Sequence, residues 1–486
     1  MFIGVCPDCA GVAARGCGRG ASPGAGQNAA LSTPLPPMRF VAVPFALLVL
    51  LLPPPAWAWG NHSPMCYRAF ERMPEVASAA PVKAEPLLDF LRAQEEAIAR
   101  TLDAQEAWAR EHLKGHAPRP DALRFVADAR RSDADRRVAF LRALRLSPQS
   151  RLALYLQVDP RDADTARPAI DVNLVTAVTP SKGATQRFAA LQPGEAIAPL
   201  AVLASACDEP DYGHDLNLFD DNPGSPQNPS YGFGKQPFGN PAVAIGSQAP
   251  FHMGFFHQGA VFNTLAPSFA RTFTELRVQQ YGGLARLAWQ TGHAYWGWRF
   301  AGLALHHVED LTQPYHASAA PGATLGHMMW VNLKAQLGAP ADRQGLVVLQ
   351  SNRHFVLEQL QTRWIIDNAR QRRDGPLELA LRDAARDAHY PPWSPTYVRE
   401  VVAAEAFAAG PATDAAVVVG APAKFVTDPN FDFAANEATL GPELARDLQG
   451  QRDALHRAMA ELLGHFGAHS RNVLRGLLKQ AGQATP

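Results

Sequence analysis

The sequence predicts an all-α fold, a multi-helix bundle with loop insertions and at most a small β-hairpin. Apolar residues recur at intervals of three and four along several long segments, which is the periodicity of a helix that buries one face. Strand-like alternation is confined to two short runs, 151–158 and 170–178, which favours one hairpin over a sheet domain. The helical segments are 86–113, 121–144, 284–310, 328–337, 352–370, 376–388 and 449–480.

Composition and charge narrow the classes of partner. The chain has 486 residues, of which 47% are hydrophobic and 19% are charged, so it can bury a sizeable core and is long enough for two or three domains. Its formal net charge is +0, whereas proteins that hold nucleic acid do so through many Lys and Arg contacts. We therefore expect no stable nucleic-acid complex, although a small catalytic cleft is compatible with this charge.

The segment 38–58 has the organisation of a secretory signal peptide. Arg39 precedes an apolar run that ends at Pro53, and residues 56–58 form a small-x-small cleavage site. The run is shorter than the roughly 20 apolar residues that span a bilayer. We therefore expect an exported protein, periplasmic or secreted, whose mature chain begins at Trp59.

Cysteine usage follows from this processing. Residues 1–37 lie upstream of the signal peptide and are expected to be a non-native extension, so Cys6 and Cys9 are not interpreted as a zinc knuckle or a redox pair. The mature chain keeps Cys66 and Cys207. We predict that they form a disulfide in an oxidising compartment. The alternative is two free buried thiols, because Cys is also a common small core residue.

The mature chain, 59–486, is expected to be a single mainly helical domain. The segment 215–250 is rich in Gly, Pro, Asn and aromatic residues, which predicts a long loop insertion. We expect a second loop over 411–429 and a C-terminal helical extension over 430–486.

The strongest chemical signal is the sequence HHVEDLTQPYH at the end of an apolar helix. His306 and Asp310 are four residues apart, so a helix places both side chains on one face, about 5.4 Å apart along the axis. Pro314 disrupts the helix, which lets His316 turn back toward the same centre. A single His on an apolar helix is more often a core residue, but imidazole and carboxylate together are zinc ligands.

Two further elements add candidate ligands. His354 and Glu358 are again four residues apart on a predicted helix and offer one nitrogen and one carboxylate. At the mature N-terminus, the α-amino group and carbonyl of Trp59 can chelate a metal, with His62 three residues later. This chelate exists only after the signal peptide is removed.

Together these motifs resemble the zinc-dependent phospholipase C family and the related single-strand nucleases with a trinuclear zinc site. Members begin with Trp and carry a His-x3-Asp-x5-His helix motif followed by a His-x3-Asp/Glu pair. The resemblance covers motifs from Trp59 to Glu358, roughly two thirds of the mature chain. It implies a helical bundle of this family's type that holds three zinc ions.

The resemblance also implies which residues hold each zinc. The first ion would be held by Trp59, His62 and Asp310, and Asp310 would bridge to a second ion that His306 also binds. The third ion would be held by His316, His354 and Glu358. An insertion between His316 and His354 is longer than in the family and contains a further His, which ranks below His354 as a ligand.

The family needs one more Asp and one more His on the second zinc. We favour Asp208 with His252, and Asp208 would also orient or deprotonate the reacting water as the catalytic carboxylate. Asp211 is the close alternative for the carboxylate, and His257 is an alternative for the imidazole. His214 is a distant one.

The chemistry that the resemblance implies is hydrolysis of a phosphodiester by zinc-activated water. The favoured substrate is a phospholipid cleaved on the glycerol side of the phosphate. The alternatives are a secreted single-strand nuclease or 3′-nucleotidase, and a non-catalytic protein that binds zinc for stability. We expect a monomer, with peripheral membrane contact through loops of the catalytic domain. The aromatics of 215–250 would either meet lipid or pack onto the fold.

Overall fold

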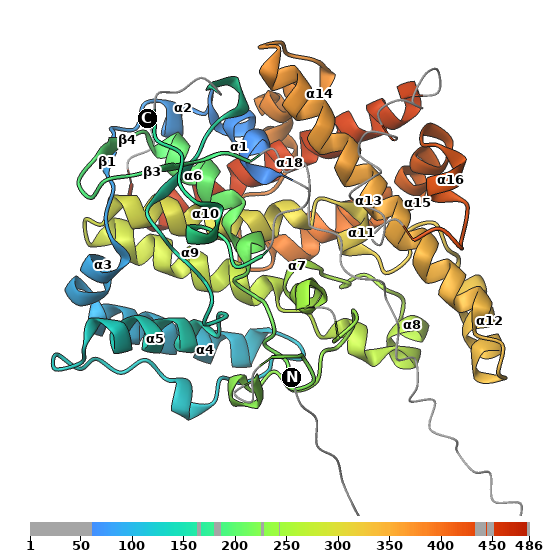
Figure 1. The fold of residues 1–486 in the computed structure, drawn as a ribbon, viewed down its shortest axis with the longest axis horizontal. Helices are drawn as coiled ribbons and strands as arrows, with labels where there is room; N and C mark the ends of the chain where they lie inside the picture. The colour runs from blue at the N-terminus through green and yellow to red at the C-terminus, as the bar shows by residue number, and fades with distance from the viewer. Residues whose placement is uncertain are drawn as a thin grey trace, which may run out of the picture. The chain divides into compact units, whose positions relative to one another are not determined.

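Helices α9 (Thr274–Gln290) and α10 (Ala294–Asp310) form the central pair of the bundle (Figure 1). The computed structural model describes residues 61–162, 167–178, 186–224, 228–242, 244–432, 444 and 452–483. All of them belong to one unit, Phe45–Pro486. Gly292, whose φ of 84° lies in the left-handed region, separates the two helices, because that conformation ends a helix and favours glycine.

The predicted all-α fold is confirmed, since helices make up most of the described chain. Some predicted segments are divided: 86–113 contains two helices, and Gly292 interrupts 284–310. The remaining α-helices are α1 His62–Phe70, α2 Pro74–Ala77, α3 Leu87–Ala93, α4 Glu95–His112, α5 Asp133–Leu144, α6 Pro199–Cys207, α7 Ala249–His252, α8 Ala260–Leu265, α11 Pro314–Ala317, α12 Leu325–Gln336, α13 Ala341–Arg370, α14 Pro376–Arg382, α15 Ala403–Gly420, α16 Ala423–Val426 and α18 Arg452–Gln480.

Two small antiparallel sheets accompany the helices, each with two strands. Strand β1 (Val82–Lys83) pairs with β4 (Ala196–Ile197), and β2 (Tyr155–Gln157) pairs with β3 (Phe188–Ala190). The prediction of a strand in the run 170–178 is wrong. This run forms a 3₁₀ turn instead, because the Asp171 carboxylate accepts a hydrogen bond from the Asn173 N–H at 2.9 Å.

Close packing of α6 on α10 brings the ligand-bearing segments together. A Cβ added at Gly302 would lie 2.6 Å from the Ala206 Cβ and 2.6 Å from the Leu203 carbonyl oxygen. Only glycine therefore allows this approach. Helix α1 packs against α6 and α18, and all nine of its residues are buried.

The aromatic residues of 215–250 pack inside the fold. Phe219 and Phe233 are 0% and 1% exposed and lie in one apolar cluster with Phe251 and Phe273. The Arg145 guanidinium lies 4.1 Å from the Phe233 ring centroid. The interpretation that these aromatics meet a lipid surface is therefore wrong, because burial of large rings is the stronger effect.

The prediction of a loop over 411–429 is also wrong. Helix α15 continues through Pro411 to Gly420, and α16 follows after two residues. Almost every residue of α15 is apolar or small, so periodicity does not distinguish a buried face. The helix also contains Pro411, a residue that usually disrupts a helix interior.

One helix among the described residues, Val398–Gly420, is long and apolar enough to cross a membrane by length and composition alone. Its Asp414 is buried, however, and the carboxylate accepts hydrogen bonds from Tyr315 Oη at 2.7 Å and Arg353 Nη1 at 2.8 Å. This face of the helix therefore packs against the bundle.

Candidate metal centre

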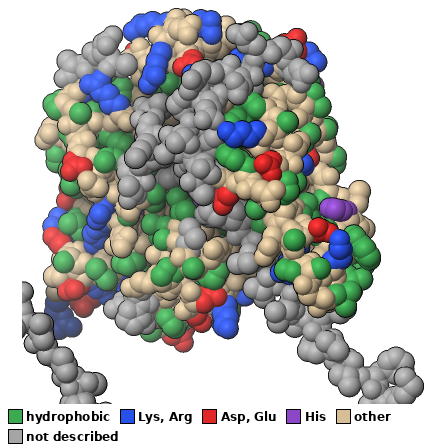
Figure 2. Space-filling view, turned by 45° about the vertical axis from the view of Figure 1, so that its right-hand side comes forward, with side chains coloured by type: hydrophobic (Ala, Val, Ile, Leu, Met, Phe, Trp, Pro, Cys, Tyr) green, Lys and Arg blue, Asp and Glu red, His purple; other side chains and the backbone are tan. Residues whose placement is uncertain are grey.

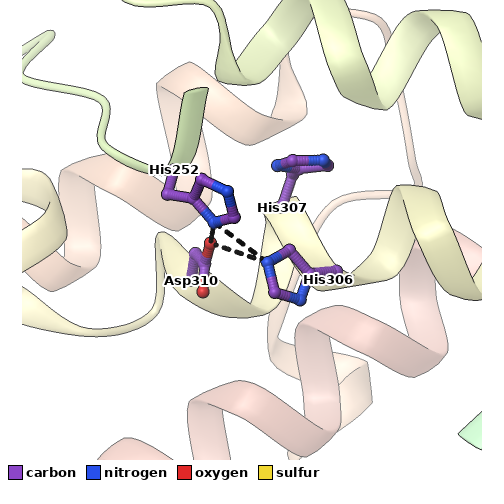
Figure 3. Close-up of side chains that lie close together, drawn as sticks. All are labelled: His252, His306, His307 and Asp310. Carbon is purple, nitrogen blue, oxygen red and sulfur yellow. Dashed lines mark hydrogen bonds and ion pairs between the residues drawn. The ribbon is translucent and has the colours of Figure 1, made fainter. Parts of the chain in front are cut away.

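The C-terminal end of α10 carries the centre of the site. His306 and Asp310 are fully buried, and His306 Nε2 lies 3.3 Å from Asp310 Oδ2. His252, the last residue of α7, places its Nδ1 2.8 Å from Asp310 Oδ2 and 3.0 Å from His306 Nε2 (Figure 3). The structure thus brings together the three residues that the resemblance assigned to one zinc.

His306 is held in one orientation by the backbone of α6. Its Nδ1 lies 2.6 Å from the Cys207 carbonyl oxygen, so Nδ1–H donates there and the Nε2 lone pair faces His252 and Asp310. Such a contact fixes the tautomer of a ligating histidine. This contact requires the end of α6 to lie against α10.

A second group shares Asp310 with the first. His62 Nε2 lies 3.2 Å from Asp310 Oδ1, while Oδ2 of the same carboxylate faces His252. The ligand atoms of His62, Asp211 and His306 lie within 4.8 Å of one another. The two oxygens of Asp310 therefore face different imidazoles, and Asp310 is the carboxylate that the resemblance expects to bridge two ions. Burial alone would raise its pKa, but the surrounding imidazoles outweigh burial and hold the pKa of Asp310 well below its usual value.

The structure places Asp211, the alternative carboxylate, in this group. Asp211 Oδ1 lies 3.7 Å from both His252 Nδ1 and His306 Nε2. The favoured Asp208 instead accepts hydrogen bonds from the His62 backbone N–H and Gln157 Nε2. A 3₁₀ turn after α6, Glu209–Tyr212, produces this difference because it turns Asp211 toward α10.

The third group is formed by His316, His354 and Glu358. Between ligand atoms the distances are 3.1 Å for His316 Nε2 to His354 Nε2, 2.6 Å for His354 Nε2 to Glu358 Oε1 and 3.7 Å for His316 Nε2 to Glu358 Oε1. His316 Nδ1 lies 3.0 Å from the His252 carbonyl oxygen, which connects this group to the first. Burial lowers the pKa of His354 to about 3 and raises the pKa of Glu358 to about 7.

These donors fit zinc. Zinc–nitrogen bonds of about 2.0–2.1 Å in a tetrahedral site put ligand atoms about 3.3 Å apart. The nitrogen and oxygen atoms of the first and third groups lie 2.6–3.7 Å apart, and those of the second group lie within 4.8 Å of one another. Among the described residues, the buried atoms His62 Nε2 and Asp310 Oδ1 face each other at 3.2 Å, but neither forms a hydrogen bond. Buried polar atoms are almost always satisfied, so this pair of atoms fits the two sides of a bound ion.

Three other candidate histidine ligands lie outside the three groups. His257 Nε2 lies 2.7 Å from the Arg399 carbonyl oxygen, and His214 Nδ1 lies 3.2 Å from Tyr281 Oη. His327 is exposed on α12. Trp59 lies outside the described residues, so the N-terminal chelate stays a prediction.

Cys66 and Cys207 are brought together, but as two free buried thiols rather than as a disulfide. Both face the Glu309 carboxylate, with Sγ to Oε1 distances of 3.1 Å and 3.7 Å. Burial raises the pKa of both thiols, that of Cys207 to about 12. Two protonated thiols can therefore donate to Glu309, which corresponds to the alternative of free thiols.

Sequence reasoning missed two residues on α10. Glu309 Oε2 lies 2.8 Å from His62 Nδ1 and so orients that imidazole. His307 lies beside His252, His306 and Asp310, and neither of its buried ring nitrogens has a hydrogen-bond partner among the described residues (Figure 3). The sequence indicated these two residues only by placing them next to His306 and Asp310.

Comparison of the chain with family models, with curated proteins and with solved structures finds no match. The interpretation of the site therefore depends on the motifs and on the geometry of the side chains.

Proposed function

We propose that the chain is an exported zinc-dependent hydrolase of phosphodiesters, with phospholipase C-like cleavage of phospholipids as its favoured activity. One observation carries this proposal: the two oxygens of the Asp310 carboxylate face His62 and His252, and a third buried group is joined to them through the contact of His316 with the His252 carbonyl. A single structural zinc needs only four ligands, so three adjacent groups support a catalytic cluster.

Zinc bound in such a cluster lowers the pKa of a bound water and neutralises charge on phosphoryl oxygens. The chain's own residues hold the donors in place. Glu309 orients His62, and the Cys207 carbonyl orients His306. Asp211 Oδ1 faces His252 and His306, so it is the carboxylate that can orient or deprotonate a water, and burial raises its pKa toward that of a general base.

In this proposal Asp208 supports the site by holding His62 in place. Its carboxylate accepts the backbone N–H of His62, Gln157 Nε2 and, at 3.4 Å, the Tyr212 hydroxyl. These contacts hold the start of α1 against the end of α6. Asp208 is therefore a positioning residue, and the catalytic role expected for it passes to Asp211.

The test compares two substrates with protein secreted from the Met38 start. Release of phosphocholine from phosphatidylcholine is measured beside cleavage of single-stranded DNA, each with and without a zinc chelator. We expect chelator-sensitive hydrolysis of phosphatidylcholine. Cleavage of DNA alone would assign the nuclease alternative, and tight zinc without turnover of either substrate would assign the non-catalytic one.

A matched pair of variants links the activity to the site. His306→Ala removes a buried imidazole that contacts Asp310, and it should abolish hydrolysis. His112→Ala removes an exposed imidazole that contacts the Trp108 carbonyl and ring, and it should leave hydrolysis unchanged. Equal activity of the two variants would contradict the proposal.

A further inference from the structure

An apolar cavity of about 410 Å³ lies between α8, the 3₁₀ turn Pro267–Ala270, α12 and α13. This volume is within the range of pockets that bind small molecules, roughly 300–1,000 Å³. The polar residues of the lining are few: Asn332, Arg343 and Gln350. Its apolar walls include Phe262, Phe269, Met328, Leu346 and Val347.

Four of the α12 residues that line the cavity also form a partly exposed apolar stripe. Leu325, Met329 and Leu333 recur every four residues and are 36%, 45% and 43% exposed, and Trp330 beside them is 57% exposed. In Figure 1 this helix projects away from the other helices, and Figure 2 shows hydrophobic side chains gathered toward the right-hand edge of the surface. Contiguous exposed apolar side chains of this kind mark an interaction surface.

Two segments of the chain contribute residues both to the cavity and to the third metal group. Ala319 and Ala320 line it three and four residues after His316, and Gln350 lines it one helical turn before His354 on α13. The segments that carry His316 and His354 therefore also line the cavity. The insertion between His316 and His354 builds the α12 wall.

We propose that the cavity holds an alkyl chain of the lipid substrate and that the α12 stripe contacts the lipid surface. This inference rests on the proposed function and names the part of the molecule that recognises the lipid. A nucleotide is disfavoured, because polynucleotides are held by several Lys and Arg residues and Arg343 is the one cation in the lining. An alkyl chain gains from burial against apolar walls, and Trp330 suits the water–lipid interface.

The experiment compares phosphatidylcholines with short soluble chains and with long chains. Gly326→Leu narrows the cavity. A Cβ at Gly326 meets no heavy atom within 4 Å, and leucine favours a helix more than glycine does, so the variant should fold. Trp330→Ala removes the exposed ring, and Leu379→Ala on α14 is its matched control, since Leu379 is 59% exposed.

We expect Gly326→Leu and Trp330→Ala to lower kcat/KM for the long-chain lipid about tenfold, which corresponds to roughly two methylene groups that are no longer buried. The short-chain lipid and the Leu379→Ala control should be unaffected. Equal losses on both lipids, no loss on either, or a dimer that Trp330→Ala dissociates would overturn the inference.

The cavity can be tested separately from the proposed function. If the wild-type protein hydrolyses no lipid, calorimetry with hexadecylphosphocholine, which needs no hydrolysis, still tests the cavity. Binding that Gly326→Leu weakens about tenfold would uphold the alkyl-chain site, whereas no binding to the wild-type protein would overturn it.

Discussion

Replacing Glu358 by Gln should stabilise the protein without zinc and destabilise it with zinc. In the absence of metal, burial raises the pKa of Glu358 from 4.5 to about 7, which corresponds to about 3 kcal/mol. Because the folded-state pKa is the higher one, the stability that the protonated carboxyl contributes is complete below about pH 4.5 and is lost as the pH rises through about 7. A neutral Gln avoids that loss.

The free energy of unfolding in urea, measured at pH 5 and pH 8, checks this expectation. At pH 8 and with a chelator, Glu358→Gln should be more stable than the wild-type protein by about 2 kcal/mol, because the amide keeps part of the contact with Gln313 Nε2 at 2.9 Å. With saturating zinc the order should reverse, since the ionised carboxylate becomes a ligand.

Glu96→Gln is the control for this measurement. Its carboxylate is 81% exposed and lies 3.6 Å from Arg100, so the substitution should change stability little under any of the conditions. A stability difference between Glu358→Gln and wild type that is the same at pH 5 and pH 8, or that keeps its sign when zinc is added, would refute the reasoning.

Four further substitutions test the roles assigned to the site and one buried ion pair beside it, Arg277 with Asp215. Asp310→Asn should lower kcat/KM at least about 100-fold and release zinc from two groups, measured by kinetics and metal analysis, because both groups share this carboxylate; loss of one ion alone would contradict the bridge. Asp211→Asn should lower kcat about 100-fold or more, whereas Asp208→Asn should cost about tenfold or less and mainly reduce zinc retention; the reverse order would restore Asp208 as the catalytic carboxylate. Arg277→Met should lower the free energy of unfolding by about 3–5 kcal/mol in urea, because it leaves buried Asp215 without its ion pair; a change below about 1 kcal/mol would contradict that reading.

Local spacing accounts for the part of the site that could be predicted. His306 and Asp310 share a helix face because side chains four residues apart do so in any helix, and the same rule applies to His354 and Glu358. His316 follows because Pro314 begins α11 immediately after α10.

Tertiary packing accounts for the part that could not be predicted. The choice between Asp208 and Asp211 depends on a 3₁₀ turn whose orientation is set by the packing of α6 on α10. Gly302 allows that packing, but its sequence context alone does not show which helix will approach it. The spacing of the motif gives Glu309 no role, because its carboxylate orients His62, which is 247 residues away in the sequence.

In the fold, too, local sequence patterns predict some elements, and tertiary packing determines the others. Helices with an apolar and a polar face, such as α4 and α18, were predictable from periodicity. The pairing of β2 with β3 was not, because strands of three residues carry too little alternation to identify their partner.

Elemental analysis of zinc in protein secreted from the Met38 start tests the central claim most directly. A form that keeps one extra residue before Trp59 serves as the comparison, because it cannot form the N-terminal chelate. We expect about three zinc ions per chain in the first form, one for each of the three groups of His and carboxylate ligands, and fewer in the second. Folded protein that binds no zinc in either form would contradict it.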